Sequence, residues 1–130
     1  MTRPMLLLLL ALPAFACASP ASSPDYQQAY DTCLEQAGGI NNGTVDACSS
    51  TVSEQAKVEM TRLYRSFYRR LLDQSPDDAA ALDRAQKSWL VYRDLHCQLA
   101  GAHVGSPMYS FCPMQLNIAR VNELRELVGQ

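Results

Sequence analysis

Four cysteines at two equal spacings constrain the fold of this chain more than any other feature. Apart from Cys17, the cysteines are Cys33 and Cys48, 15 residues apart, and Cys97 and Cys112, again 15 apart. An even number of cysteines in an exported chain is read as disulfides, and we expect each equally spaced pair to be joined locally. The other two connectivities stay open at this stage, because sequence alone does not separate them. A closed loop of this size contributes on the order of 3 kcal/mol by restricting the unfolded chain.

The N-terminus carries the pattern that predicts export. Arg3 precedes the apolar run Leu6–Leu12, and small residues follow. This order is typical of a secretory signal peptide, and the apolar run is shorter than the roughly 20 residues that cross a bilayer. We therefore predict a signal peptide over residues 1–18.

Two cleavage sites compete at the end of this segment. Ala16-Cys17-Ala18 favours ordinary cleavage before Ser19, which leaves a short flexible spacer over residues 19–24. The alternative is a lipoprotein site that would leave a lipid on Cys17. The first outcome predicts a periplasmic or secreted protein, and the second a lipid-anchored envelope protein.

Length and charge bound the mature chain to one acidic domain. Removal of residues 1–18 leaves 112 residues, with 10 basic and 13 acidic side chains and a net charge of −3. That length supports a single modest core, so we expect one domain over residues 25–130. The charge argues against nucleic acid as a partner. Membrane contact is expected only through a lipid on Cys17.

Three serine–proline pairs predict helix starts. Ser23-Pro24, Ser75-Pro76 and Ser106-Pro107 each place a capping hydroxyl before a proline that suits the first helical position, and the first two are the clearer signals. Gly38-Gly39 should end the first helix, because glycine adopts a left-handed cap at little cost. The predicted helices span residues 24–37, 44 or 45 to 73, 76–102 and 113–128, with loops over 38–43 and 101–112.

Apolar residues recur every three or four positions in the predicted helices, whereas no stretch alternates long enough to predict a strand. In the second helix these residues are Val52, Ala56, Met60, Leu63, Phe67 and Leu71, widened by Tyr64, Tyr68 and Leu72; in the third they are Leu82, Ala85, Trp89 and Tyr92, with Leu90; in the last they are Met114, Ile118, Val121, Leu124 and Val128. Packing these stripes together predicts an all-α fold, a small four-helix bundle cross-linked by two disulfides.

The third predicted helix carries the most specific motif in the chain. It reads Leu82-x-x-Ala85-Gln86-x-x-Trp89-x-x-Tyr92-Arg93-Asp94-x-x-Cys97, and Cys112 and then Arg120-x-x-Glu123-Leu124 follow it. With the upstream cysteines and Tyr64, this pattern resembles the LprI-type lysozyme-inhibitor N-terminal domain family over roughly residues 26–127.

The resemblance implies an exported, cysteine-linked helical domain, some relatives of which inhibit lysozyme. It makes Gln86, Trp89, Tyr92, Arg93 and Asp94 the motif residues of this chain. The segment after Cys97 departs from the glycine- and serine-rich form expected there, because it contains His103 and Pro107.

Arg93 has two interpretations. Steps of seven and four residues place Gln86, Arg93 and Cys97 on one side of a helix. Arg93 could recognise a partner, but the favoured interpretation is structural, with Arg93 paired to a carboxylate such as Glu123 or Asp31 and Gln86 bonded to the backbone.

Two further groups could be binding surfaces. The aromatic residues Trp89, Tyr92, Tyr64 and Tyr68 could form a binding face, but aromatic residues at helical spacing favour a place in the core. The arginines Arg62, Arg65, Arg69 and Arg70 form a basic ridge, which is more typical of a solvated face than of a docking site.

The sequence does not predict a metal or cofactor site. His96 and His103 lack the closely spaced Cys/His pattern of a structural zinc site. His103 with Met108 and Met114 could bind copper, but methionines that fill gaps in the core are the favoured interpretation. We therefore expect no metal and no cofactor.

No catalytic group emerges either, so we do not predict an enzyme. The cysteines are better explained as disulfides, and Asp77-Asp78 fits the first turn of a helix better than acid–base chemistry. An enzyme would need a polar cleft with a group of strongly shifted pKa.

The leading hypothesis is a binding protein that inhibits a lysozyme-like cell-wall hydrolase by steric block. The loops 38–43 and 101–111 would be held in shape before binding, and His103, Met108 and Tyr109 are the predicted contacts. The alternative is a structural or adaptor protein of the envelope, without inhibitory activity, whose helix faces make the contacts.

Overall fold

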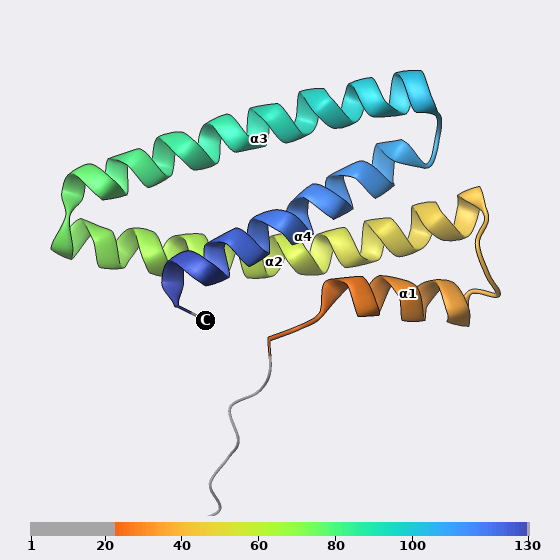
Figure 1. The fold of residues 1–130 in the computed structure, drawn as a ribbon, viewed down its shortest axis with the longest axis horizontal. Helices are drawn as coiled ribbons and strands as arrows, with labels where there is room; N and C mark the ends of the chain where they lie inside the picture. The colour runs from red at the N-terminus through yellow and green to blue at the C-terminus, as the bar shows by residue number, and fades with distance from the viewer. Residues whose placement is uncertain (1–22, 130) are drawn as a thin grey trace, which may run out of the picture.

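The computed structural model describes residues 23–129, which form four α-helices and no strand (Figure 1). The helices are α1 (Tyr26–Gln36), α2 (Asn42–Gln74), α3 (Pro76–Val104) and α4 (Met108–Val128). Disulfides join Cys33 to Cys48 and Cys97 to Cys112. The predicted all-α bundle with two local disulfides is confirmed. The predicted signal peptide, Cys17 and residues 19–22 of the spacer lie outside the described residues.

Two helices begin at polar caps that were not predicted from the sequence. The side chain of Asp25, and not that of Ser23, accepts a hydrogen bond from the Gln28 amide at the start of α1. At the start of α2 the Asn41 side chain accepts from the amides of Gly43 and Thr44, while the Thr44 hydroxyl accepts from the Asn41 amide. This capping box starts α2 at Asn42, two or three residues before the predicted start at residue 44 or 45, because it satisfies amides that the helix itself leaves unpaired.

The predicted loop over residues 101–112 is wrong, because most of it is helical. α3 continues to Val104, and α4 begins at Met108, five residues before the predicted start at Pro113. Pro113 lies inside α4, although a proline there removes one backbone hydrogen bond. The Phe111 amide donates to the Pro107 carbonyl at 2.9 Å, so the helix is already formed one turn earlier. The third serine–proline pair therefore does mark a helix start, although neither it nor Ser75 caps through its side chain.

α2 is the central element, because it packs against each of the other three helices. Figure 1 shows α2 and α3 as a long hairpin, with α4 crossing α2 and α1 lying along its first half. The largest fully buried side chains of the core come from the predicted stripes of α2 and α4, namely Val52, Leu63, Met114, Val121 and Leu124. None of the helices within residues 23–129 is long and apolar enough to span a bilayer.

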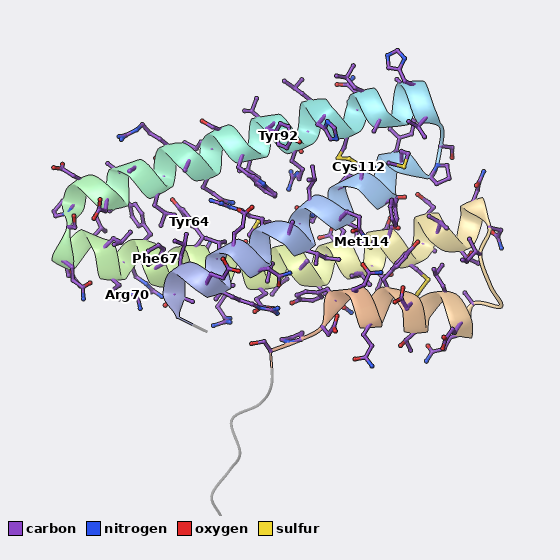
Figure 2. The ribbon with its side chains drawn as sticks, viewed as in Figure 1. Tyr64, Phe67, Arg70, Tyr92, Cys112 and Met114 are labelled. Atoms are coloured by element: carbon purple, nitrogen blue, oxygen red, sulfur yellow. A yellow bond between two sulfur atoms is a disulfide. The ribbon has the colours of Figure 1, made fainter. Side chains whose placement is uncertain are left out.

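Three residues predicted to face the core are exposed. Tyr92 of α3 is 53% exposed and stacks on the ring of His96, with 5.3 Å between the ring centroids (Figure 2). Ala85 of the same helix and Leu72 of α2 are exposed as well. For these positions helical spacing alone did not identify the covered face.

Candidate functional site

The α1–α2 loop and the α3–α4 loop lie at the same end of the molecule. Figure 1 shows the α1–α2 connection and the α3–α4 connection on the same side of the bundle, opposite the α2–α3 turn. Each is bracketed by a disulfide, with Cα–Cα distances of 5.7 Å for Cys33–Cys48 and 5.4 Å for Cys97–Cys112. Figure 2 shows the second disulfide, next to the label of Cys112, close to that end. We call this region, residues 37–41 and 103–109, the loop end.

Side-chain hydrogen bonds order the first of these loops. The Thr44 hydroxyl donates to the Gly39 carbonyl at 2.7 Å, and the Asn41 side chain caps α2. Gly38 and Gly39 both have positive φ angles, 87° and 111°, as the predicted glycine stop requires. Between these fixed points Ile40 is 81% exposed. An apolar side chain is thus held outward on a short ordered loop.

The second loop presents an aromatic ring. Tyr109 is 56% exposed, and its ring packs against the buried Gly101, where an added Cβ would clash with ring atoms. His103 is also exposed, whereas Met108 is half-buried. The three predicted contact residues therefore share this end, with His103 and Tyr109 the more accessible. Ile40 was not predicted as a contact residue. The only signal in the sequence is its position between the glycines that end α1 and the residue that caps α2.

The family-motif residues form a polar network between helices. The Arg93 guanidinium donates to Asn117 Oδ1 of α4 at 3.0 Å, and Asn117 donates to Ser53 Oγ of α2 at 2.8 Å. Arg93 also donates to Asp94, and neither Glu123 nor Asp31 is its partner, so the predicted carboxylates were wrong. The structural interpretation nevertheless fits, because this chain of hydrogen bonds joins α3, α4 and α2.

Trp89 makes cation–π contacts with two arginines at the same interface. The guanidinium carbons of Arg93 and Arg120 are 5.3 Å and 5.8 Å from the indole centroid. Arg120 also donates to Gln86 Oε1 at 3.0 Å, so Gln86 bonds a side chain and not the backbone as predicted. Cation–π contacts of this kind contribute about 0.5–2 kcal/mol each. The motif therefore fixes how α3 sits on α4, and Tyr92 alone among the motif aromatics faces solvent.

A buried ion pair that was not predicted from the sequence joins α2 to α4, and Tyr26 of α1 bonds to it. Glu59 of α2 accepts from Arg125 Nε at 3.0 Å and Nη2 at 2.8 Å, and from the Tyr26 hydroxyl at 2.6 Å. Arg125 also donates to the Pro24 carbonyl at 2.8 Å. The side chains of Glu59 and Arg125 are only 8% and 13% exposed. This cluster holds the segment before α1 against the other two helices.

The pKa of Tyr26 is raised and the pKa of Glu59 is lowered in this cluster. Burial raises the pKa of Tyr26 to about 12, together with its hydrogen bond to the Glu59 carboxylate. Burial alone would raise the pKa of Glu59, but the hydrogen bonds from Arg125 and Tyr26 and the charges of Arg125 and Arg62 outweigh it and hold the pKa below its ordinary value. A carboxylate held ionised by a bidentate arginine is an anchor, not a proton donor.

A shallow groove of about 450 Å³ runs between α2 and α3. At its rim Asp83 accepts from Lys87 at 2.7 Å and from the Tyr64 hydroxyl at 3.1 Å. The hydrogen bond from Lys87 lowers the pKa of Asp83. Within residues 23–129 no group of three or more histidine, cysteine, aspartate or glutamate side chains could hold a metal ion. The Tyr64–Asp83 hydrogen bond links α2 to α3 at the rim of the groove.

The basic ridge of the second helix borders another groove, of about 570 Å³, that Lys57, Arg62, Arg65 and Arg69 line. Arg62 reaches Glu59 at 3.6 Å, whereas Arg65 and Arg69 take part in none of the salt bridges found within residues 23–129. The ridge is distant from the loop end along α2 (Figure 1).

Comparisons with known proteins identify one family. The family model described as lysozyme inhibitor LprI matches residues 17–124. An uncharacterized protein of Rhizobium meliloti (strain 1021), R02472, is 31% identical over 127 aligned residues, which cover 86% of this chain and 87% of the relative. No solved structure matches the chain.

Proposed function

This chain belongs to the lysozyme inhibitor LprI family, and on that basis we propose that it is an exported binding protein that inhibits a lysozyme-like cell-wall hydrolase. The family match is the observation that carries the proposal. The family's description is that of an inhibitor and not of an enzyme, and the disulfides point to a compartment outside the cytoplasm. The loop end is the surface that we assign to the hydrolase.

Two ordered loops on one face support inhibition by steric block. Ile40, His103 and Tyr109 are exposed on connections that disulfides and caps already hold in place. A surface that is ordered before binding loses little conformational entropy on association, so more of its contact energy appears as affinity. Exposed apolar and aromatic side chains are also the usual anchors of protein interfaces.

The distribution of charge supports a cationic partner at the same end. Residues 23–56, which form α1 and the first half of α2, contain five carboxylates and no lysine or arginine: Asp25, Asp31, Glu35, Asp46 and Glu54. The basic ridge follows on the second half of α2. A cationic lysozyme would therefore be steered toward the loop end more strongly than the small net charge indicates, and salt should weaken that steering.

Inhibition of cell-wall lysis tests the proposal. Purified mature protein should slow lysis by at least one lysozyme class at low micromolar concentration. Combining Ile40→Ala, His103→Ala and Tyr109→Ala should weaken inhibition at least tenfold, because it removes the anchors without touching the core. The matched control is Val58→Ala, which is 73% exposed on α2 away from the loop end. Absence of both binding and inhibition across several lysozyme classes would rule the proposal out.

The adaptor alternative keeps one specific observation in its favour. Arg65 and Arg69 border a groove and take part in none of the salt bridges within the described residues. An adaptor would use such a helix face and leave the loops passive. Capture of an envelope protein that is lost on Arg65→Glu with Arg69→Glu, but kept in the triple alanine variant of the loop end, would favour it.

Export and processing are part of the proposal. The N-terminal pattern predicts cleavage before Ser19, with lipidation of Cys17 as the alternative. Intact-mass measurement of the exported protein separates the two, because a lipid on Cys17 adds a large defined mass and fixes the N-terminus at residue 17.

A further inference from the structure

α3 has two apolar faces, and the described bundle covers only one. The inner face, built on Ala79, Leu82, Cys97 and Gly101, is buried against α2 and α4. The outer face carries no charge over seven positions that are all exposed: Ala81, Ala85, Ser88, Tyr92, Leu95, Leu99 and Ala102. A helix that is apolar on opposite sides is normally covered on both.

The spacing of the outer face is that of a helix-pairing seam. Its residues alternate steps of four and three from Ala81 to Ala102, which is the 3.5-residue repeat that keeps a stripe facing one partner helix. Tyr92, Leu95 and Leu99 are 53%, 58% and 60% exposed, and the adjoining Val91 is 58% exposed. Single exposed apolar residues are ordinary, but six in register, with only Ser88 among them, form a contiguous patch that marks an interaction site. Figure 1 shows this helix at the edge of the molecule, with α2 and α4 on one side only.

We propose that the outer face of α3 pairs two copies of this chain, with the two α3 helices antiparallel. The sizes of the seam residues indicate that the partner is a second copy of the chain. Only small residues precede Tyr92 in the seam, whereas Leu95 and Leu99 follow it, with Ala102 at the end. An antiparallel pair places Ala85 of one copy opposite Leu99 of the other and Ser88 opposite Leu95, so large side chains meet small ones and interdigitate. Tyr92 then lies on the two-fold axis of a self-complementary interface.

Charge selects the same orientation. Asp78 continues the seam by one step toward the N-terminus of α3, next to Asp77. A parallel pair would bring these carboxylates against their own copies, which is destabilising. The antiparallel pair places them instead near the last turn of the other helix, which contains His103.

The available area fits a reversible dimer. About half of each large seam side chain is exposed, and with the small residues this amounts to roughly 500 Å² a copy, or about 1,000 Å² in all, the lower bound of a specific interface. An interface at this lower bound is typical of weak, transient complexes, so we expect dissociation in the micromolar range.

Sedimentation velocity of the mature, disulfide-bonded protein tests the pairing, from about 1 to 500 µM. A monomer–dimer equilibrium is expected, and Leu95→Glu should weaken it more than tenfold because it places a carboxylate in the seam. The control Val58→Glu adds the same charge at another exposed apolar position, on α2, and should leave the equilibrium unchanged. Circular dichroism and thermal melts of both variants establish that they fold.

A charge swap tests the antiparallel register. Adding Ser88→Lys to Leu95→Glu should restore dimerisation, because each new lysine faces the new glutamate of the other copy. A parallel pair would place like charges together and would not recover. A wild-type protein that stays monomeric at 500 µM, or a dimer that Leu95→Glu leaves intact, would overturn the proposal, and a failure of the double variant to recover would overturn its orientation.

Discussion

Removal of Arg125 should destabilise the bundle far more than removal of a surface cation. In Arg125→Met the Glu59 carboxylate loses two hydrogen bonds, at 3.0 Å and 2.8 Å, while its side chain is only 8% exposed. Breaking a buried ion pair in this way typically costs 3–5 kcal/mol, because an uncompensated charge is left behind. Glu59 keeps the Tyr26 hydroxyl and the more distant Arg62, so we expect the low end, about 3 kcal/mol.

Urea denaturation with intact disulfides, followed by circular dichroism at 222 nm, measures this change. A loss of about 3 kcal/mol corresponds to a fall in Tm of roughly 12 °C for a domain of this size. The control is Lys57→Met, which removes an exposed pair with Glu54 and should cost less than about 1 kcal/mol.

The double variant Glu59→Met with Arg125→Met distinguishes the loss of the ion pair from the cost of leaving one charge buried without a partner. Replacing both members by apolar groups should recover much of the loss, because no unpaired charge remains. If Arg125→Met costs no more than Lys57→Met, water reaches the Glu59 carboxylate in solution and the ion pair is not buried.

The remaining predictions concern titration, cross-linking and the loop end. Because the pKa of Tyr26 is raised from 10.0 to about 12, its contribution is fully present below pH 10 and is lost as the pH rises toward 12, so Tyr26→Phe should flatten the alkaline fall in the free energy of unfolding. Replacing Cys97 and Cys112 by alanine should lower that free energy by about 3 kcal/mol in urea titrations, and a change below about 1 kcal/mol would contradict the loop-closure account. Gly101→Ala should push the Tyr109 ring aside and weaken inhibition with little change in Tm. If inhibition is unchanged, Tyr109 is not part of the surface that contacts the hydrolase.

Local patterns predicted most of the fold. The cysteine spacing identified both disulfides. Each pair is 15 residues apart and flanks a short loop between two helices, so the two cysteines meet where the chain reverses. The apolar stripes of α2 and α4 identified most of the core, because each of these helices has one continuous covered face. The start of α4 was misplaced, because Pro113 was given more weight than Ser106-Pro107, although a helix held by tertiary contacts tolerates a proline in its second turn.

The candidate site was predicted less completely. His103, Met108 and Tyr109 were placed together by their nearness in sequence, and the structure adds Ile40 from a loop more than 60 residues away. The partners of Arg93 were wrong, because a guanidinium among several carboxylates and amides bonds to whichever of them the packing brings near.

The sequence by itself determined the four helices and the two local cross-links, because these depend on residues within a few turns of one another. Only the tertiary structure decided that Glu59 pairs with Arg125 and that Tyr92 faces outward. The ion pair joins residues 66 positions apart, beyond the reach of any local pattern. α3 carries two apolar faces at the same helical spacing, so only the packing of α2 and α4 against it determines which face the bundle covers.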